Sequence, residues 1–444
     1  MSATLSEFIE NLFASFRSEG IEFVVLRNYE SLPFSLNSKD LDILIEHRNL
    51  RNSIVLLHET AKKLGYYYYS EIFYKNIYCY TFFDSTFNSI KVDLLVNYEN
   101  KGRIFLTSEE ILNKAEKFSS FKIPAEEHEF TILLFKTLLA GGFVNEKYIP
   151  KIKKSATEHS RAVSRILKRY LSQKTADEIL RKILTDDIKG INKMHKIINL
   201  QTYLKLFFNS PISFLVNFLM HYYFEFLKLL NPSYKRIIVV LGPDGVGKTT
   251  FIENLVPKLA GVLNIDSKGI KVYHFRPNIF PNLGKLFGKD TQNFAVYKPY
   301  SEKPANFLSS FLRLSYYTLD YILGYLIKIL PKQRRGNIFI FDRYYHEFLV
   351  DSERSKIRLP LFMRKVFFKI VPKPTLTIVL LAPEKVILER KSELDEEKIR
   401  QLIESYKSLK NLDKNVYFLD ATKQPTDLTN EALKIIIEHF ANPI

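Results

Sequence analysis

The segment 235–254 constrains the fold of this chain more than any other stretch, and it reads KRIIVVLGPDGVGKTTFIEN. The β-branched run Ile237–Val240 predicts a buried strand, and the residues from about Thr249 predict a helix. Between them the chain matches G-x-x-x-x-G-K-[ST], the pattern of a loop that binds phosphate. The alternative is a tight turn with an incidental lysine, but the strand before the loop and the helix after it favour a nucleotide-binding α/β domain.

Each residue type in this loop has a chemical reason. Glycines let the backbone curl so that successive amides point at phosphate oxygens, and the following helix N-terminus attracts the same anion. Lys248 is expected to reach the β- and γ-phosphates of ATP, and the Thr249 hydroxyl to hold Mg²⁺. The predicted nucleotide-binding residues are Gly242, Asp244, Gly245, Val246, Gly247, Lys248, Thr249 and Thr250.

Composition limits the other possibilities. A length of 444 residues suggests two or three domains, and a net charge of +17 favours anionic partners, although a solvated lysine-rich surface explains most of that excess equally well. Nucleic-acid binding has only this charge in its favour, because no recognisable motif accompanies it. The single cysteine, Cys79, excludes an internal disulfide framework, and the N-terminus shows no secretory signal, so we expect a cytoplasmic protein.

The first hundred residues predict an α+β domain that carries a cluster of carboxylates. Helices are expected at 1–20 and 50–64, and strands at 21–26, 40–45, 66–71, 77–83 and 90–96. Alternation places Asp40 and Asp42 on one face of their strand, and Asp93 lies in the middle of another. Three such carboxylates are typical ligands of a divalent metal. An acidic strand edge that discourages unwanted pairing is the alternative.

This N-terminal region resembles the nucleotidyltransferase superfamily. Small members of that superfamily carry a D-h-[DE]-h strand and a later aspartate strand, and Asp40, Asp42 and Asp93 match those three positions. The resemblance implies a metal site of the kind used for nucleotidyl transfer. The family places Gly-Ser or Gly-Gly after the first strand, whereas this chain has Arg27-Asn28.

The pattern of residues 101–232 predicts a helical extension and connector. Apolar residues at spacings of three and four predict helices at 130–139, 162–171 and 176–184. The segment 203–230 is very apolar, but polar residues interrupt it too often for a membrane-spanning helix. We expect it to pack between two domains; the alternative is a helix that lies on a membrane surface.

Strands and helices alternate after the phosphate loop, which predicts a parallel sheet with helices on both faces. The expected strands are 270–275, 337–341, 376–381 and 416–419. Such sheets bind ligands beyond the carboxyl ends of their strands. Arg276, Asp342 and Arg343 directly follow two of these strands, and Arg390 and Lys391 begin a basic region after a third.

Residues 235–440 resemble the thymidylate kinase family, one of the nucleoside monophosphate kinases. The resemblance rests on GPDGVGKTT at 242–250, on Arg276-Pro277, on Asp342-Arg343-Tyr344 and on Pro383 through Lys391. It implies ATP and Mg²⁺ as cofactors. It also implies that Asp244 lies beside the acceptor sugar, that Arg276 holds the acceptor phosphate, and that Asp342 works with the metal.

The same resemblance implies roles for further residues. Arg343 is expected to face the phosphoryl groups or the acceptor, and Tyr344 to contact the substrate. Basic residues of a mobile lid are expected to close over the transferring phosphate, and the candidates are Arg390, Lys391, Lys398 and Arg400. These roles agree with the needs of phosphoryl transfer, which depends on positioning, positive charge and exclusion of water rather than on a covalent nucleophile.

The chain departs from the family on the acceptor side. The helix before Asp342 carries Asp320-Tyr321 where the family carries D-R, and HFRPNIFPNLG lacks the wording R-E-P-G-G-T. ATP use is therefore better supported than dTMP as the acceptor. The apolar segment 306–329 is expected to be a buried core helix, with an apolar acceptor groove as the alternative.

The sequence thus predicts three parts: a nucleotidyltransferase-like α+β domain at 1–100, a helical extension and connector at 101–232, and a thymidylate kinase-like P-loop domain at 233–444. The main hypothesis is ATP- and Mg²⁺-dependent phosphoryl transfer to a nucleotide, a sugar phosphate or another acceptor. The alternatives are nucleotidyl transfer by the N-terminal half with a regulatory P-loop, and a nucleotide-switched scaffold at the membrane surface. The sequence leaves the acceptor open, and also whether the chain forms a homodimer.

Overall fold

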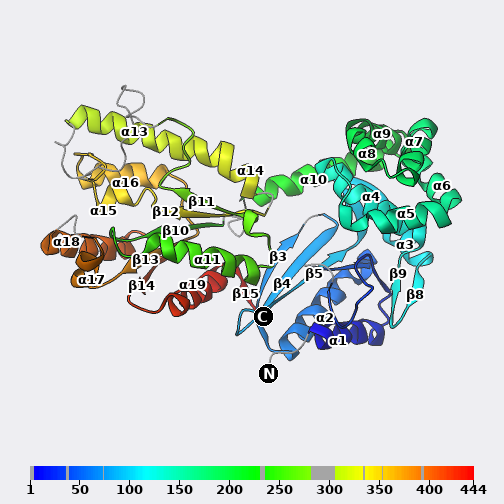
Figure 1. Cartoon of the computed structure of the whole chain (residues 1–444), viewed down its shortest axis with the longest axis horizontal. Helices are drawn as coiled ribbons and strands as arrows, with labels where there is room; N and C mark the ends of the chain where they lie inside the picture. Colours follow the sequence, from blue (N-terminus) through cyan, green and yellow to red (C-terminus); the bar gives the residue numbers. More distant parts are fainter. Residues whose placement is uncertain are drawn as a thin grey trace. The chain divides into compact units, whose positions relative to one another are not determined.

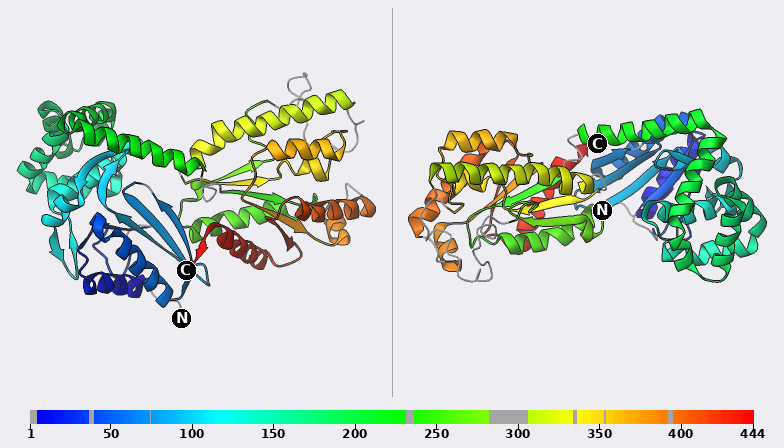
Figure 2. Two further views of the ribbon diagram at one scale, coloured as in Figure 1. Left: turned by 180° about the vertical axis from the view of Figure 1, so that it is seen from behind. Right: turned by 90° about the horizontal axis from the view of Figure 1, so that it is seen from above.

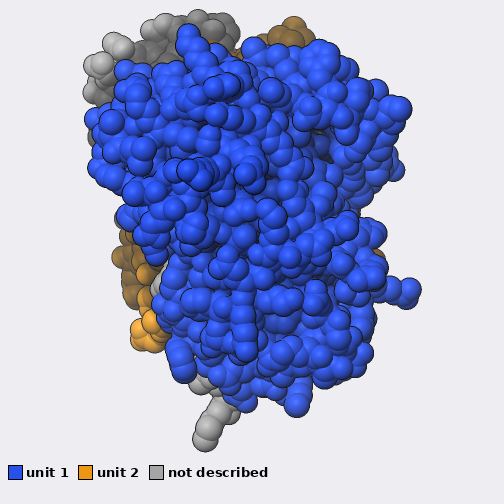
Figure 3. Space-filling model, turned by 90° about the vertical axis from the view of Figure 1, so that its right-hand side faces the viewer, with its two compact units in different colours: residues 1–227, 443–444 blue, residues 228–442 orange. Residues whose placement is uncertain are grey.

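The computed structural model describes residues 5–36, 40–73, 75–230, 236–281, 306–333, 336–352, 354–391 and 395–444. The chain divides into two compact units, which Figure 3 colours separately. Unit 1 comprises residues 1–227 with 443–444, and unit 2 comprises residues 228–442. Each unit has its own sheet and its own apolar core. The three-part division expected from the sequence stays a prediction.

Unit 1 is built on a mixed eight-stranded sheet with the order β15-β3-β4-β5-β2-β1-β9-β8. Its strands are β1 (Phe23–Val25), β2 (Leu41–Ile45), β3 (Tyr66–Phe73), β4 (Ile77–Asp84), β5 (Ser89–Leu95), β8 (Glu116–Phe118), β9 (Phe121–Ile123) and β15 (Asn442–Pro443). Helices α1 (Leu5–Ser18) and α2 (Leu50–Lys63) pack on it through a core that includes Phe8 and Leu57. Because β2 and β5 are parallel neighbours, their residues align and Asp42 lies opposite Asp93.

The structure corrects the prediction that residue 101 begins an all-helical region. The hairpin of β6 (Asn97–Asn100) and β7 (Arg103–Thr107) comes first, and β8 and β9 follow as a second hairpin. Lys101, Gly102 and Ser119 adopt positive φ values of 51°, 79° and 51° at the two turns. Strands β6 to β9 are three to five residues long. Such short strands show no clear alternation of apolar and polar residues, so the sequence pattern did not predict them.

Helices form the remainder of unit 1. They are α3 (Ser108–Asn113), α4 (Glu126–Gly141), α5 (Ile149–Glu158), α6 (Ser160–Tyr170), α7 (Gln173–Leu184), α8 (Ile188–Lys193), α9 (His195–Asn209) and α10 (Pro211–Leu230). The apolar segment 203–230 forms the end of α9 and all of α10, with Ser210 between them. Among the described residues, none of the helices combines the length and apolar character needed to cross a bilayer.

Unit 2 is built on a five-stranded sheet with the order β11-β12-β10-β13-β14, in which every neighbouring pair is parallel. The strands are β10 (Ile237–Leu241), β11 (Ile270–His274), β12 (Ile338–Asp342), β13 (Leu376–Leu381) and β14 (Val416–Asp420). Helices α11 (Lys248–Val262) and α19 (Pro425–Phe440) lie on one side of the sheet, and α13 (Phe307–Gly324) and α16 (Leu361–Ile370) lie on the other (Figures 1 and 2). This arrangement confirms the predicted parallel sheet with helices on both faces.

Shorter elements connect these layers. They are a π-helical turn (Tyr325–Ile329), α14 (Leu330–Gln333), α15 (Glu347–Val350), α17 (Glu384–Arg390) and α18 (Glu396–Lys407).

Helix α13 is only half buried, which corrects the expectation of a core helix. Leu314 and Tyr321 pack on the sheet beside Val239 and Phe341. The opposite side of the helix is exposed, and Leu308 retains 65% of its accessible surface.

His346 is an uncharged histidine enclosed in the core of unit 2. It is fully buried, its ring centroid lies 4.9 Å from that of Phe368, and burial lowers its pKa to about 3. An unfolded chain protonates the same histidine near pH 6.5. Above that pH this histidine does not reduce the stability of the fold, whereas its contribution destabilises the fold by about 1.4 kcal/mol for each pH unit as the pH falls from 6.5 towards 3.

We expect His346→Phe to reduce this acid-dependent loss of stability in unit 2, because phenylalanine fills the same space and cannot be protonated. Hydrogen exchange of β12 peptides in the full chain, compared between pH 4 and pH 7 after correction for intrinsic rates, measures the effect. The exposed His159 provides the matched control variant, His159→Phe. An unchanged pH dependence of β12 in His346→Phe would show that this histidine is not the cause.

Candidate active site

Two adjacent strands bring the predicted phosphate loop and Asp342 together. Val240 near the end of β10 pairs with Asp342 at the end of β12. The loop follows β10, and α11 begins at Lys248, one residue before the predicted start. Gly242 has a φ of 144°, and a Cβ atom there would lie 2.4 Å from the carbonyl oxygen of Leu380 on β13. Only glycine lets the loop begin so close to the neighbouring strand.

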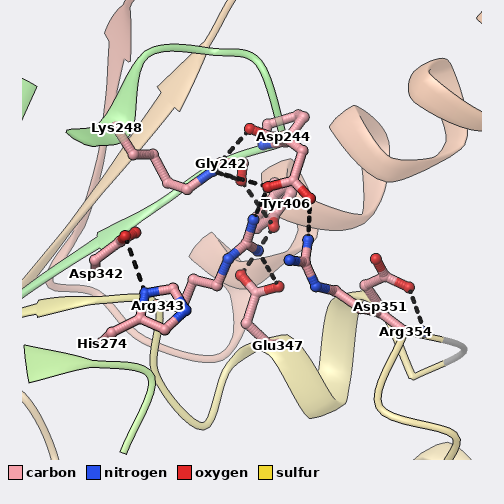
Figure 4. Close-up of polar contacts among 11 residues, drawn as sticks. Gly242, Asp244, Lys248, His274, Asp342, Arg343, Glu347, Asp351, Arg354 and Tyr406 are labelled. Atoms are coloured by element: carbon pink, nitrogen blue, oxygen red, sulfur yellow. Dashed lines mark hydrogen bonds and ion pairs between the residues drawn. The ribbon is translucent and has the colours of Figure 1, made fainter. Parts of the chain in front are cut away.

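The Lys248 ammonium is buried inside the loop. Its Nζ donates hydrogen bonds to the carbonyl oxygens of Gly242 and Pro243, at 2.8 Å each, and lies 3.7 Å from Asp244 Oδ1 (Figure 4). Burial and the nearby positive charge of Arg343 lower its pKa to about 8, although Asp244 acts in the opposite direction. The loop therefore holds a buried lysine whose ammonium group donates to two neutral carbonyl oxygens and lies near one carboxylate.

The Asp244 carboxylate joins two arginines from other parts of the chain. Arg343, directly after β12, and Arg354 each donate to one of its oxygens (Figure 4). Burial alone would raise the pKa of Asp244, but the charges of Arg343 and Arg354 lower it far below its usual value. Asp244 is consequently ionised at any physiological pH, and it fixes both guanidinium groups beside the loop.

Glu347 and Tyr406 complete this network. Arg343 Nη1 donates to Glu347 Oε2 at 2.7 Å, and the Tyr406 hydroxyl on α18 lies 2.9 Å from Glu347 Oε1 and 3.2 Å from the Gly242 carbonyl oxygen. Glu347 and Tyr406 are both buried. The network ties the loop, α15 and α18 together around the Arg343 guanidinium.

Asp342 has the properties of a metal ligand. Its Oδ2 lies 3.2 Å from Nδ1 of His274, whereas its Oδ1 is buried and has no hydrogen-bond partner among the described residues. Burial opposes ionisation of Asp342, but the His274 hydrogen bond and the Lys248 charge prevail and lower its pKa. An ionised carboxylate with a free oxygen, together with the exposed hydroxyl of Thr249, fits the oxygen ligands that Mg²⁺ prefers. Thr250 is also exposed.

A cavity of about 290 Å³ lies next to this network. Its described lining comprises His274, Phe275, Arg276, Asn278, Arg313, Tyr317, Arg343, Glu347, Arg354, Ser355 and Lys356. Five of these side chains carry a guanidinium or an ammonium group, and Glu347 is the one carboxylate in this lining. Arg343 connects the cavity to the phosphate loop, since it also contacts Asp244. The cavity is suited to an anionic ligand.

Asp320 belongs to the part of the chain that differs from the thymidylate kinase pattern on the acceptor side, and its contacts explain part of that difference. It is fully buried, and its carboxylate accepts hydrogen bonds from the amides of Asn278, Ile279 and Phe280. It also lies 3.1 Å from Arg276 Nη1. Arg276 lines the cavity, but it is held by Asp320 and is 3% exposed, and its role at the acceptor phosphate stays a prediction. Asp320 therefore shapes the backbone of the cavity wall and orients Arg276.

Of the other predicted site residues, one lies in the core of unit 2 and two lie at the phosphate loop. Tyr344 is a core residue whose hydroxyl donates to the carbonyl oxygen of Pro372, and this corrects the prediction that it contacts the substrate. Arg390 donates to the Val246 carbonyl at 3.3 Å, so it lies at the loop. A Cβ atom on Gly245 would lie 2.9 Å from the Lys391 Cβ, which places Lys391 there as well.

The remaining lid candidates have no demonstrated role. Arg400 is paired with Glu384 at 3.4 Å and with Glu396 at 3.8 Å. Lys398 is half-buried in the first turn of α18. The lid roles of both residues stay predictions.

The sequence reasoning missed His274, Glu347, Arg354 and Tyr406. Glu347 had one local signal, because it lies four residues after Arg343, a spacing at which opposite charges often pair within a helix. Arg354 and Tyr406 reach the site only through the tertiary fold.

Unit 1 brings the three predicted aspartates together. One ligand oxygen from each of Asp40, Asp42 and Asp93 lies within 4.8 Å of the others. Asp93 Oδ1 is buried without a hydrogen-bond partner among the described residues. Burial, together with the charges of Asp42 and Asp40, raises the pKa of Asp93 to about 6, although Lys91 opposes this. Such a set of carboxylates fits a divalent cation.

Three basic side chains already compensate this acidic cluster. Arg27 Nε lies 2.6 Å from Asp42 Oδ2, Lys91 Nζ lies 3.3 Å from Asp40 Oδ2, and Lys136 Nζ lies 4.0 Å from Asp42 Oδ1. The Tyr148 hydroxyl accepts a hydrogen bond from Arg27 Nη1 at 2.8 Å. The protein itself therefore supplies cations that pair with this cluster.

A comparison with known protein families supports the interpretation of unit 2. Residues 240–432 match the family model of thymidylate kinase. Among solved structures, a thymidylate kinase from Ehrlichia chaffeensis is 13% identical, over 45% of this chain and 97% of that chain, with a TM-score of 0.31. No curated protein matches the chain. The family match supports a kinase domain of the nucleotide kinase type at 240–432, whereas the comparisons give no support to the nucleotidyltransferase resemblance of the N-terminal region.

The low pKa of Lys248 predicts a pH-dependent affinity for ATP. A bound triphosphate favours the charged ammonium, so binding above pH 8 requires proton uptake. We expect the affinity to be constant below about pH 8 and to fall up to about tenfold per pH unit above it. Calorimetric titrations between pH 7 and pH 9.5 measure this dependence. Lys248→Arg, which stays charged, is expected to remove it; the same decline in this variant would assign the titration to another group.

Proposed function

We propose that unit 2 is an ATP- and Mg²⁺-dependent kinase that transfers the γ-phosphoryl group to a small acceptor that itself carries phosphate. One observation carries the proposal. Arg343 connects a phosphate-binding loop to a cavity whose described lining has five cationic side chains and one carboxylate. The family match at 240–432 supports the same reaction class.

The residues of the loop would hold the donor. Loop amides and Lys248 bind the β- and γ-phosphates, and the phosphate oxygens replace the two carbonyl oxygens that Lys248 now contacts. This exchange is favourable because hydrogen bonds between charged partners are stronger than those to neutral carbonyls. Thr249 and Asp342 would hold Mg²⁺, which neutralises charge on the phosphates.

The cavity would hold the acceptor. Arg313 lines the cavity together with Arg276, which Asp320 holds, and Arg354, which Asp244 holds, and guanidinium groups bind phosphate in a bidentate manner. Phe275 and Tyr317 provide flat apolar surfaces on which a base can stack. A nucleoside monophosphate satisfies both features, whereas a sugar phosphate uses only the first. We therefore favour the nucleotide.

Lys248→Ala tests the mechanism. We expect kcat for transfer of label from [γ-³²P]ATP to fall at least about 100-fold, because a donor aimed at the transferring phosphate is lost. The assay uses a panel of nucleoside monophosphates and sugar phosphates as acceptors. Lys268→Ala at an exposed position is the matched control. Full activity of Lys248→Ala at saturating ATP would refute the proposed mechanism.

A second candidate function is nucleotidyl transfer by unit 1, because Asp40, Asp42 and Asp93 meet as metal ligands would. In that reaction the α-phosphoryl group of ATP, and not the γ-phosphoryl group, would appear in the product. The internal cations Arg27, Lys91 and Lys136 compete with a metal for the same carboxylates, which weighs against this function.

Binding of Mn²⁺, followed by electron paramagnetic resonance, separates the two sites. In an Asp342→Asn background the remaining bound Mn²⁺ reports on unit 1, and we expect Asp42→Asn with Asp93→Asn to abolish it if unit 1 holds metal. If Mn²⁺ binding in the Asp342→Asn background is already absent, or survives these two changes, the aspartate cluster is not a metal site. [α-³²P]ATP then shows whether any label reaches a product.

A further inference from the structure

Two neighbouring helices of unit 2 expose many large apolar side chains. Helices α13 and α16 lie on the same side of the sheet, and the rings of Phe311 and Phe367 join them at 5.7 Å (Figures 1 and 2). We define the α13–α16 face as the exposed residues Phe307, Leu308, Leu312, Leu319, Leu326, Ile327, Leu361, Phe362, Val366 and Ile370. Their exposed fractions lie between 45% and 68%. A concentration of this kind usually marks a binding surface.

The exposed residues form stripes rather than scattered points. On α16, Phe362, Val366 and Ile370 are spaced four residues apart, while Phe368 is in the core. On α13, Leu312 and Leu319 follow Leu308 at spacings of four and seven residues. Each helix therefore has one apolar side toward the core and a second apolar side toward solvent.

Basic residues border this face. Residues 354–373 contain seven Lys and Arg residues and neither Asp nor Glu, although Arg354 pairs with Asp244, and Arg364 and Lys373 donate to backbone carbonyl oxygens. Lys365 and Lys369 directly precede Val366 and Ile370 in the exposed stripe of α16. The acidic residue of α13, Asp320, is fully buried against Arg276. Exposed apolar residues bordered by lysine are typical of helices that lie in the interface of an anionic membrane.

We propose that the α13–α16 face binds the surface of an anionic lipid bilayer. The apolar stripes enter the boundary between headgroups and acyl chains, and the basic residues contact anionic headgroups. A second copy of the chain fits this face less well, because pairing would bring two basic rims together. The proposal does not depend on the kinase reaction.

Helix α13 contributes both to the exposed face and to the lining of the cavity. Arg313 and Tyr317 of α13 line the cavity, as do Arg354 and Lys356 of the basic segment. A docked α13 would therefore hold the cavity within about one helix diameter, ~10 Å, of the lipid surface.

Vesicle co-sedimentation of the full chain tests the proposal. The vesicles contain phosphatidylcholine alone or with 30% phosphatidylserine, in about 0.1 M or 0.5 M salt. We expect binding to the anionic vesicles at low salt and little binding to neutral vesicles or at high salt. Phe362→Ser with Val366→Ser should weaken binding at least about tenfold, and Lys365→Glu with Lys369→Glu about 30-fold or more.

Matched variants control for general effects of charge and apolar surface. Lys268→Glu with Lys434→Glu makes the same charge change at exposed positions elsewhere in unit 2, and Leu204→Ser with Phe208→Ser removes exposed apolar residues from α9. Both should bind like the wild type. Absence of wild-type binding, or loss of binding only in the α9 variant, would overturn the proposal. A wild-type dimer that Phe362→Ser with Val366→Ser converts to a monomer, as seen by analytical ultracentrifugation, would assign the face to self-association instead.

Discussion

The candidate active site of unit 2 depends on the burial of two positive charges, Lys248 and Arg343, close to each other. Burial first, and then the charge of Arg343, lower the pKa of Lys248. The carboxylates of Asp244 and Glu347 compensate them, and these reach the site from the phosphate loop and from α15. Removing one partner of a buried ion pair usually destabilises a fold strongly, since a charge is left uncompensated. Charge balance, more than apolar packing, thus holds the separate segments of this site in one arrangement.

The parts of this site that could be predicted from the sequence are those that depend on residues close together in the chain. The loop needs glycines at fixed spacing, and β13 was predicted with its observed bounds because a buried parallel strand is a continuous apolar run. Arg354 and Tyr406 follow no such pattern. Tyr344 shows the opposite error, since a family motif suggested substrate contact. Arg343, at a φ of 71°, turns the chain after β12, and the next side chain enters the core.

In unit 1 the sequence likewise predicted the carboxylates of the cluster but not the cations that pair with them. Strand alternation correctly placed Asp40 and Asp42 together, and the parallel pairing of β2 with β5 added Asp93. The cations that neutralise them come from a strand and from a helix, as Lys91 and Lys136 do, and no sequence spacing predicts their approach. The two units therefore differ in electrostatic character: unit 1 gathers three carboxylates, whereas the described lining of the unit 2 cavity has five cationic side chains, three of which pair with carboxylates of the protein.

The π-helical turn after α13 has a consequence for how unit 2 tolerates insertions and deletions. A π turn contains one residue more than an α turn, so it shifts all later side chains by about 100° around the axis. Lys328, within this turn, donates to the carbonyl oxygens of Pro277 and Asn278, in the segment that Asp320 also holds. Loss of one residue between α13 and Lys328 would rotate that ammonium by about 100° around the helix axis, away from the segment that carries Asn278 of the cavity wall.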